Sequence, residues 1–277
     1  MTVGDRVKSA AKGLLRMAPQ NHRGDWLHHL VNFWVAHGRL PAHPRKSLFN
    51  DYIFHLKNSA QAYDPLRQLC SDKALVKLYI SAIVGPEFVP ATIHTFRSPD
   101  ELDDFVAPTY CVVKPTHLSG LVIFLEAGSQ LSDPDKEKLS LTFSRNLYSE
   151  TREPTYKFLR PSVILEEAVG RDHEIWDYKV FCWKREPRLI QVDVDRHTNH
   201  KRSIYDTSWR MLPIRYNFES CGEVPRPKAL DAMLRLAKSL SAPFESVRVD
   251  FYITDRRVYV GEITHFPEQG HGRFGNE

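Results

Sequence analysis

The closing stretch "RVDFYITDRRVYVGEIT", residues 248–264, decides the fold, because two apolar segments flank a polar turn and predict a β-hairpin. Strand alternation places Arg248 and Asp250 on one face of the first strand, and it gives Glu262 the corresponding place on the returning strand. Two carboxylates brought together on such a sheet repel each other, and loss of water adds to that cost unless a cation or a proton intervenes. The hairpin therefore predicts a divalent metal site, and oxygen ligands of this kind suit Mg²⁺.

A plainer interpretation of the hairpin stays open. Both acids can instead face solvent or pair with the arginines at 248, 256 and 257, as ion pairs on exposed sheet faces commonly do. The stretch "YCVVKPTHLSG", residues 110–120, favours the first interpretation, because an apolar strand ends in Lys114 before a polar loop with a single glycine, Gly120. An ammonium and several backbone N–H groups at such a loop can bind phosphate. The alternative is that Lys114 extends into solvent along its apolar stem.

The stretch "VILEEAVGRDHEIWDYKVF", residues 163–181, is a third candidate, because an apolar strand runs into Glu166 and Glu167 before a turn. The end of such a strand offers backbone groups to an adenine edge, and Glu174 can accept hydrogen bonds from ribose hydroxyls. Lys179 lies on the next predicted strand. It is either a second phosphate lysine or an edge-strand lysine that prevents aggregation.

Length and composition exclude several classes of protein. The 277 residues, 42% of them hydrophobic, suit one large domain or two closely packed lobes. A net charge of +4 is too small and too dispersed for a nucleic-acid binder but is compatible with an anionic substrate. The four cysteines form no C-x-x-C pair, so neither a disulfide framework nor a zinc site is expected. Apolar runs far shorter than about 20 residues predict no membrane span, and without a signal peptide the protein is expected to be cytoplasmic.

The rest of the chain predicts a mixed α+β fold. Residues 1–64 show helical spacing of aromatic and apolar residues, and from residue 88 short apolar strands alternate with helical stretches. Ser71 is the expected N-cap of a helix that runs to about Val84, with Lys73 in its first turn. The segment "DVDRHTNH", residues 193–200, predicts a polar strand end and loop in which Arg196 binds phosphate or an acidic substrate. The alternative is a metal cluster built from its Asp and His residues.

Eight motifs together resemble the ATP-grasp superfamily, and more closely its TupA-like group, which is associated with teichuronopeptide synthesis. In chain order they are "FNDYIFHLK", "SDKALVKLYI", "VVKPTHLSG", "EEAVG", "DYKVFCW", "VDVDRH", "VRVDFY" and "GEITHFPEQG", spread over about residues 49–272. The resemblance implies an ATP-grasp fold of class α+β, with two lobes that enclose an ATP site. It implies a helical N-terminal segment at 1–64, a first lobe at 65–165, and a second lobe with the metal site at 166–277.

The resemblance also implies roles for single residues. The implied nucleotide-binding residues are Lys73, Lys114, Ser119, Gly120, Glu166, Glu167, Val169 and Glu174, and His173 competes with Glu174 for the ribose. The implied magnesium ligands are Asp250 and Glu262, and the catalytic residues are Arg248, Lys179 and Arg196. Many members have asparagine where this chain has Thr264, so one magnesium ion is expected rather than two. The phosphate loop is poor in glycine, with Leu121 after Gly120, which argues against close wrapping of the backbone around the phosphates.

The function implied by the resemblance is an ATP-dependent ligation of a carboxylate to an amine through an acyl phosphate. The cofactors are then ATP and Mg²⁺, and the partners are a small-molecule amine or amino acid and a carboxylate acceptor, with no nucleic acid. The acceptor is expected to be a precursor of a cell-surface polysaccharide or peptide. Two alternatives are an ATP-dependent phosphotransferase that acts on a hydroxyl group and a non-catalytic nucleotide-binding scaffold.

Overall fold

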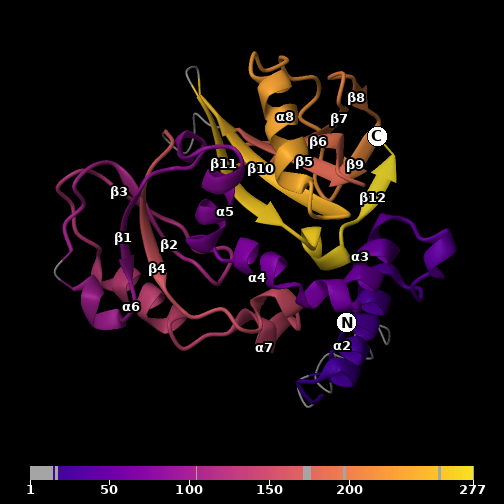
Figure 1. Cartoon of the computed structure of the whole chain (residues 1–277), viewed down its shortest axis with the longest axis horizontal. Helices are drawn as coiled ribbons and strands as arrows, with labels where there is room; N and C mark the ends of the chain where they lie inside the picture. Colours follow the sequence, from indigo (N-terminus) through magenta and orange to yellow (C-terminus); the bar gives the residue numbers. More distant parts are fainter. Residues whose placement is uncertain are drawn as a thin grey trace. The chain divides into compact units, whose positions relative to one another are not determined.

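The computed structural model describes residues 15, 18–103, 105–170, 176–195, 198–254 and 257–276 (Figure 1). Two compact units divide the chain, and each is built from separate segments. The first unit comprises Met1–Gln68, Leu147–Phe158 and Phe266–Arg273, and the second comprises Leu69–Asn146, Leu159–His265 and Phe274–Glu277. Helices and antiparallel sheets occur together, so the predicted α+β class is confirmed. The predicted division at residues 64 and 165 stays a prediction.

The helices and strands have the following bounds. The α-helices are α2 (His22–His37), α3 (Phe49–Lys57), α4 (Pro65–Ser71), α5 (Leu75–Ile83), α6 (Asp133–Thr142), α7 (Leu147–Thr151) and α8 (Leu230–Ser241). The 3₁₀ helices are η1 (Pro44–Lys46), η2 (Ala60–Tyr63), η3 (Pro86–Phe88), η4 (Pro99–Leu102), η5 (Pro154–Tyr156) and η7 (Pro267–Gly270). The strands are β1 (Thr92–Phe96), β2 (Cys111–Pro115), β3 (Ile123–Leu125), β4 (Val163–Glu167), β5 (Asp177–Trp183), β6 (Glu186–Val194), β7 (Lys201–Asp206), β8 (Met211–Leu212), β9 (Ile214–Tyr216), β10 (Ser246–Ile253), β11 (Val258–Thr264) and β12 (Phe274–Asn276). Within the described residues, no helix combines the length and apolar character needed to cross a bilayer.

Polar side chains of α2 and α3 hold the segment that follows β11 in the first unit. His37 Nε2 lies 2.9 Å from the carbonyl oxygen of Gly270, and the Asn50 amide donates to the Gly272 carbonyl at 2.7 Å. The buried Lys57 ammonium donates to the Gln269 carbonyl at 3.2 Å. The same segment adds Phe266 to the small core of this unit, whose other buried members are Ile53, Leu56 and Ala62.

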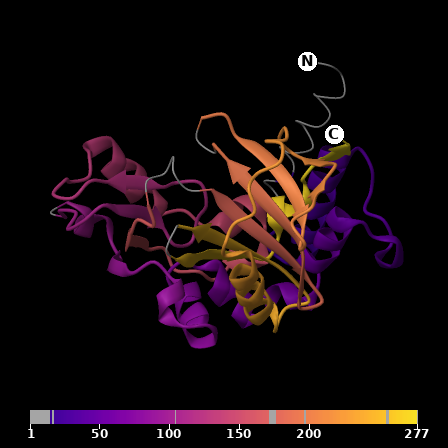
Figure 2. The same ribbon diagram turned by 90° about the horizontal axis from the view of Figure 1, so that it is seen from above.

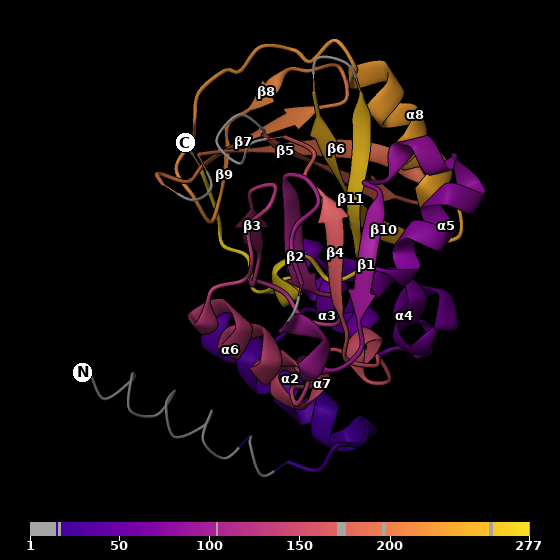
Figure 3. The ribbon, with the colours of Figure 1, turned by 90° about the vertical axis from the view of Figure 1, so that its left-hand side faces the viewer.

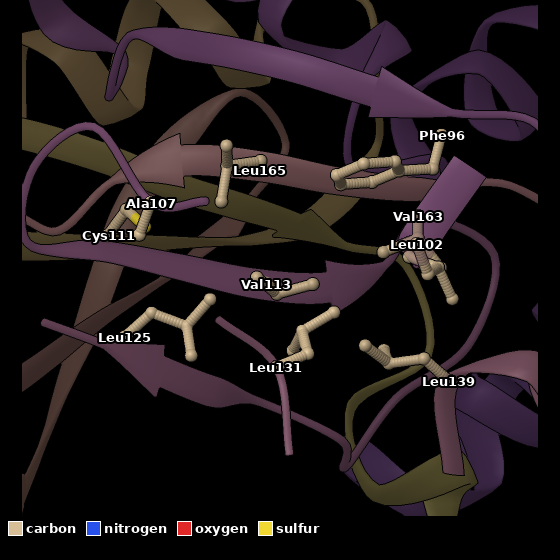
Figure 4. Packing of buried hydrophobic residues seen from close by; sticks show 10 residues of the cluster. All are labelled: Phe96, Leu102, Ala107, Cys111, Val113, Leu125, Leu131, Leu139, Val163 and Leu165. Carbon is tan, nitrogen blue, oxygen red and sulfur yellow. The ribbon is translucent and has the colours of Figure 1, made fainter. Parts of the chain in front are cut away.

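A four-stranded antiparallel sheet forms one part of the second unit, in the order β1-β4-β2-β3 (Figure 3). Alternate residues of these strands point into one core, as strand geometry requires, and α6 contributes Leu139 to it. The buried members are Phe96, Leu102, Ala107, Cys111, Val113, Leu125, Leu131, Leu139, Val163 and Leu165 (Figure 4). Strands β2 and β4 contribute to this core and also carry candidate residues.

A six-stranded antiparallel sheet forms the other part, in the order β11-β10-β5-β6-β7-β8, and β9 pairs with β12. Helix α8 packs on strands β5, β6 and β10 (Figure 2). The packing uses an apolar stripe at helical spacing. The buried apolar residues of this stripe are Leu230, Met233, Leu236, Ala237 and Leu240. One face of the sheet is thereby covered, which leaves the other face for the polar side chains of the same strands.

The predicted hairpin of β10 and β11 is confirmed, and Asp250 lies directly opposite Glu262. The predicted N-cap at Ser71 is wrong, because Ser71 ends α4. The Asp72 carboxylate instead accepts the backbone N–H groups of residues 74 and 75 at 2.8 and 3.0 Å, since a carboxylate next to the helix start can accept both. Lys73 therefore lies between α4 and α5 rather than in a first helical turn.

Candidate functional site

A row of charged side chains crosses the six-stranded sheet, and we call it the charged row. Its members are Arg202 on β7, Asp193 on β6, Asp177 and Lys179 on β5, Arg248 and Asp250 on β10, and Glu262 on β11. The strand register brings them together, because Asp250 pairs with both Lys179 and Glu262, and Asp193 pairs with both Asp177 and Arg202. Side chains directly opposite on antiparallel strands are close neighbours, so seven charges share one continuous surface.

Arg248 holds both acids of the hairpin. Its Nε donates to Asp250 Oδ1 at 2.7 Å, and its Nη2 donates to Asp250 Oδ2 at 2.7 Å. The same Nη2 donates to Glu262 Oε1 at 3.2 Å and to Thr264 Oγ1 at 3.1 Å. The structure therefore shows that Asp250 and Glu262 both form ion pairs with Arg248, which is one of the interpretations that the sequence left open. Magnesium binding by Asp250 and Glu262 stays a prediction.

The two acids nevertheless differ in exposure and in ionisation. The Asp250 side chain is 5% exposed, whereas 42% of the Glu262 side chain is exposed. Burial raises the pKa of Asp250 above its ordinary value, although Arg248 and Lys179 act in the opposite direction. Burial acts on Glu262 too, but the charges of Arg248 and two lysines outweigh it and hold the pKa of Glu262 below its usual range. The repulsion between the two acids that the sequence predicts is therefore present. The charge of Glu262 helps to raise the pKa of Asp250, the more buried of the two.

Lys179 lies among three carboxylates. Its Nζ is 3.2 Å from Asp250 Oδ2, 3.4 Å from Asp177 Oδ2 and 3.9 Å from Asp193 Oδ2, and its side chain is 6% exposed. Strand β5 lies inside the sheet, between β10 and β6. The interpretation of Lys179 as an edge-strand lysine is therefore wrong.

Asp193 and Arg202 form the far end of the charged row. Arg202 donates to both Asp193 oxygens, at 2.6 and 3.1 Å, and Gln191 Nε2 donates to Oδ2 at 2.9 Å. Although burial acts in the opposite direction, the Arg202 hydrogen bonds and charge lower the pKa of Asp193 to about 2. Arg202 was missed by the sequence analysis, because strand alternation gives the face on which it lies but not the register that sets it opposite Asp193.

The metal-cluster alternative for residues 193–200 has one close pair among the described residues, in which His200 Nε2 lies 3.3 Å from Asp193 Oδ1. Asp193 is buried against Arg202, whereas Asp195 is exposed at the end of the strand. Within the described part of the chain, no group of three or more His, Cys, Asp or Glu side chains is placed to hold a metal ion. Arg196 lies outside the described residues, as do His173 and Glu174.

Three lysines gather around the end of β4, and we call Lys73, Lys77, Lys114 and Glu166 the lysine cluster. Lys114 donates to Glu166 Oε1, and Lys77 Nζ lies 2.7 Å from Glu166 Oε2. The Lys73 ammonium donates to the backbone carbonyl of Leu118, in the loop after β2. The Lys114 side chain is 13% exposed, so the interpretation that it extends into solvent is wrong.

Burial and charge set the ionisation of this cluster. Burial lowers the pKa of Lys73 and of Lys77, because the ammonium form loses water. Burial alone would raise the pKa of Glu166, but the charges of Lys114 and Lys77 lower it. Both Glu166 oxygens are engaged by lysines, so its side chain is a counter-ion within the cluster. Lys77 is the member that the sequence analysis missed.

The strand end and the loop beside the cluster carry the remaining candidates. The N–H of the exposed Glu167 donates to Ala91 O at 2.9 Å, and the N–H of Ala168 donates to Tyr110 O at 3.3 Å. Val169 is the first residue beyond these two bonds. In the loop after β2, Ser119 and Gly120 are exposed, and Gly120 has a φ of +92°, a conformation that favours glycine.

The lysine cluster and the charged row belong to the same unit and interact electrostatically. The charge of Lys73 is one of those that lower the pKa of Glu262. In return, Glu262 raises the pKa of Lys73 against the effect of burial. The structure therefore brings the predicted lysine at the start of the second unit under the influence of the predicted metal acid near its end.

Comparison with known proteins identifies relatives at the level of family. The profile of a family described as TupA-like ATPgrasp matches residues 54–277. No curated protein matches the chain. Three solved structures are similar to this chain. D-alanine–D-alanine ligase from Bacillus anthracis, complexed with ATP, is 16% identical with a TM-score of 0.38, and the match covers 71% of this chain and 54% of that one.

The second structure is D-alanine–D-alanine ligase from Helicobacter pylori, which is 16% identical with a TM-score of 0.41, over 73% of this chain and 53% of that one. The third is the ATP-grasp ligase PsnB complexed with a minimal precursor, 14% identical with a TM-score of 0.40, over 74% of this chain and 54% of that one. The match thus spans little more than half the length of each of these structures.

Proposed function

Because this chain belongs to the TupA-like ATP-grasp family, we propose that it is an ATP-dependent ligase that joins a carboxylate to an amine through an acyl phosphate. The observation that carries the proposal is that one unit holds both the lysine cluster, in which Lys114 and Lys77 contact Glu166, and the charged row, in which Asp250 lies opposite Glu262. Cations suited to phosphate and acids suited to a metal ion lie within one unit. An arrangement of this kind serves phosphoryl transfer, in which catalysis consists mainly of positioning and charge stabilisation.

ATP binds, in this proposal, at the lysine cluster and the end of β4. Lys73 and Lys114 bind phosphate oxygens, and the exposed Ser119 and Gly120 add backbone N–H groups. The N–H groups of residues 167 and 168 already donate to other backbone carbonyls. The adenine edge therefore hydrogen-bonds to the Glu167 carbonyl and the Val169 N–H. Glu174, or His173, accepts from the ribose.

The donor set at the hairpin fits magnesium. Asp250 and Glu262 are direct cross-strand neighbours, and Mg²⁺ usually takes one or two protein carboxylates and completes its shell with phosphate oxygens and water. The 42% exposure of the Glu262 side chain leaves its carboxylate open to such a ligand. Asp250 and Glu262 would hold the ion, which would supply positive charge to stabilise the anionic phosphates. Arg248, which donates to both acids, would then share them with the ion.

The chain's own residues supply most of the chemistry in this proposal. An oxygen of the substrate carboxylate bonds to the γ-phosphorus, the bond to the β-phosphate oxygen breaks, and ADP leaves. Lys114, Lys179 and Arg248 stabilise the charge that develops among these anions, and Arg196 holds phosphate or the acidic substrate. The amine then bonds to the acyl carbon, the bond to phosphate breaks, and the amine loses a proton as phosphate leaves. Exclusion of water protects the acyl phosphate from hydrolysis.

The substrates extend the proposal beyond the reaction class. A small amine or an amino acid is the nucleophile, and the carboxylate belongs to a precursor of a cell-surface polysaccharide or peptide. Membership of the TupA-like family supports this choice through the resemblance described above, which links that group to teichuronopeptide synthesis. A cytoplasmic location is part of the same proposal, since ATP and activated precursors are used there.

A thermal-shift titration with Mg-ATP tests the nucleotide site. A ligand that binds only the native state raises the melting temperature. At a ligand concentration of 100 times the Kd, it adds about 2.7 kcal/mol to the unfolding free energy. We expect the wild type to be stabilised, Lys114→Ala to lose most of that shift, and the matched control Lys138→Ala to keep it, because the Lys138 side chain is 59% exposed. A wild type that shows no shift contradicts the proposal.

Hydroxylamine trapping then tests the reaction class. An acyl phosphate intercepted by hydroxylamine gives a hydroxamate, whereas transfer to a hydroxyl group does not. Candidate carboxylates are screened with Mg-ATP, and formation of ADP together with hydroxamate supports the ligase. A stable phosphate ester on a hydroxyl acceptor would instead identify a phosphotransferase.

A further inference from the structure

Glu166 lies between two lysines that differ in how they are held. Its Oε1 accepts from Lys114, and its Oε2 lies 2.7 Å from Lys77 Nζ. The side chains are 6% exposed for Glu166, 12% for Lys77 and 13% for Lys114. Solvent therefore screens these charges little, and each strongly affects the next.

The Lys77 ammonium is fully engaged. Besides Glu166, it donates to the Pro90 carbonyl at 2.8 Å and to Thr92 Oγ1 at 3.0 Å. An ammonium has three N–H donors, and these three acceptors use all of them. Lys77 is thus fixed between α5 and the start of β1, and it cannot turn to a phosphate without breaking this set.

Lys114 is held less fully than Lys77 by the residues that the structure describes. Within the described part of the chain its ammonium has one hydrogen-bond partner, Glu166, so two N–H donors remain for other acceptors. The three side chains together carry one net positive charge, from two lysines and one glutamate. Without Lys77, Lys114 and Glu166 would form a neutral pair, and an incoming anion would gain little from Lys114.

We propose that Lys77 is a positioning residue for nucleotide binding, which neutralises Glu166 so that the charge of Lys114 stays available to phosphate. The inference rests on the proposed ATP site and adds a residue to it. It also assigns the Glu166 side chain to the phosphate end of the site rather than to adenine. The alternative is that Lys77 has only a structural role and links α5 to the sheet. In that case its loss changes the stability of the protein and leaves nucleotide affinity unchanged.

A charge cycle separates these cases. Kd values for Mg-ATP and Mg-GTP are measured by calorimetry on the wild type, Lys77→Met, Glu166→Gln and the double variant. The net charge of the trio is +1 in the wild type, 0 in Lys77→Met, +2 in Glu166→Gln and +1 in the double variant. We expect Lys77→Met to weaken both nucleotides by about tenfold or more, the scale of one unscreened charge at short range. The double variant is expected to return to within about threefold of the wild type, since its net charge is restored.

Two further variants complete the design. Lys77→Arg keeps the charge and should bind within about threefold of the wild type. Lys138→Met removes an exposed lysine from the same unit and should change nothing, because the Lys138 side chain is 59% exposed. If Lys77→Met does not fold, Lys77→Arg and Glu166→Gln carry the test, with affinity retained in the first and retained or increased in the second.

Three outcomes overturn the inference. They are an unchanged affinity of folded Lys77→Met, a double variant as weak as Lys77→Met, and a Glu166→Gln variant that loses ATP affinity but keeps GTP affinity. The last result would place the Glu166 side chain on adenine. A wild type that binds neither nucleotide refutes the proposed function itself, so the two failures are distinguishable.

Discussion

Two buried ion-pair networks, one in each unit, differ in how completely the protein satisfies them. In the first unit, Asp25 accepts from Tyr148 Oη at 2.8 Å, from Arg152 Nη1 at 3.1 Å and from Tyr63 Oη at 3.4 Å. Arg152 also donates to the carbonyls of residues 18 and 19, at 2.6 and 3.0 Å. Every one of these contacts is internal, so this network is closed.

The charged row of the second unit is not closed in this way. Burial raises the pKa of Asp250 despite the charges of Arg248 and Lys179, and the neighbouring Glu262 side chain is 42% exposed. The comparison teaches that buried charge alone does not mark a functional site, because well-paired buried charges are also structural. Incomplete neutralisation beside an opening to solvent is the more specific sign.

The largest effect is expected from breaking the closed network. Arg152→Met leaves the Asp25 carboxylate buried without its cation, which typically costs about 3–5 kcal/mol. Urea unfolding at pH 7 should show a loss of this size. A loss below about 1 kcal/mol would mean that the two tyrosines suffice for Asp25, and the contrast between the networks would fail.

The next effect concerns Asp193 and Arg202 at the far end of the charged row, where a buried carboxylate is paired with an arginine as in the closed network. The pKa of Asp193 is lowered to about 2 in the folded state, from an ordinary value of 3.8, so its ionised form adds stability above pH 4. That stability, about 2 kcal/mol, is lost as the pH falls from about 4 to about 2. Urea unfolding from pH 2 to pH 7 should show this slope in the wild type and not in Asp193→Asn. Equal slopes in the two proteins would contradict the assignment.

Asp250 should behave in the opposite way. Its pKa is raised in the folded state, so ionisation at neutral pH opposes folding, and stability rises as the pH falls through that pKa. Asp250→Asn should therefore change the unfolding free energy of the protein alone by no more than about 1 kcal/mol, while the Mg-ATP thermal shift is lost. Loss of stability by several kcal/mol would class Asp250 with Asp25 as a structural acid.

The smallest effect sets the baseline for both networks. Arg226 and Asp231 form an ion pair of 2.9 Å whose side chains are 58% and 72% exposed. Arg226→Ala should lower the unfolding free energy by less than about 0.5 kcal/mol, and the small difference should vanish at high salt. A larger loss would mean that exposure does not separate strong from weak pairs in this protein.

The sequence predicted the parts of the site that depend on local spacing. The hairpin, its opposed acids and the ends of β2 and β4 follow from alternation and from turn residues, which act over a few positions. Lys77 escaped prediction because its partner Glu166 lies on a strand far along the chain, and only the folded sheet brings the two together. The N-cap was misplaced because Ser71 and Asp72 are adjacent capping residues, and their local patterns are equally good.

Register explains the other omissions. Arg202 meets Asp193 only because β6 and β7 pair in one register, and a shift of one residue would turn their side chains to opposite faces. Alternation shows that a residue faces one side of a sheet, but it does not identify the residue beside it. The predicted roles of Arg248, Lys179 and the nucleotide-binding residues stay predictions that the experiments above address.

The construction of the first unit has a consequence for synthesis on the ribosome. Its segments are Met1–Gln68, Leu147–Phe158 and Phe266–Arg273, so the unit needs residues from both ends of the chain. Helices α2 and α3 emerge early, yet Asn50 and Lys57 find their carbonyl partners only when residues 269–272 have been made. We therefore expect this unit to complete folding only after residues 266–273 have left the ribosome, in contrast to domains built from one continuous segment. Until then, the early helices are open to chaperones and proteases.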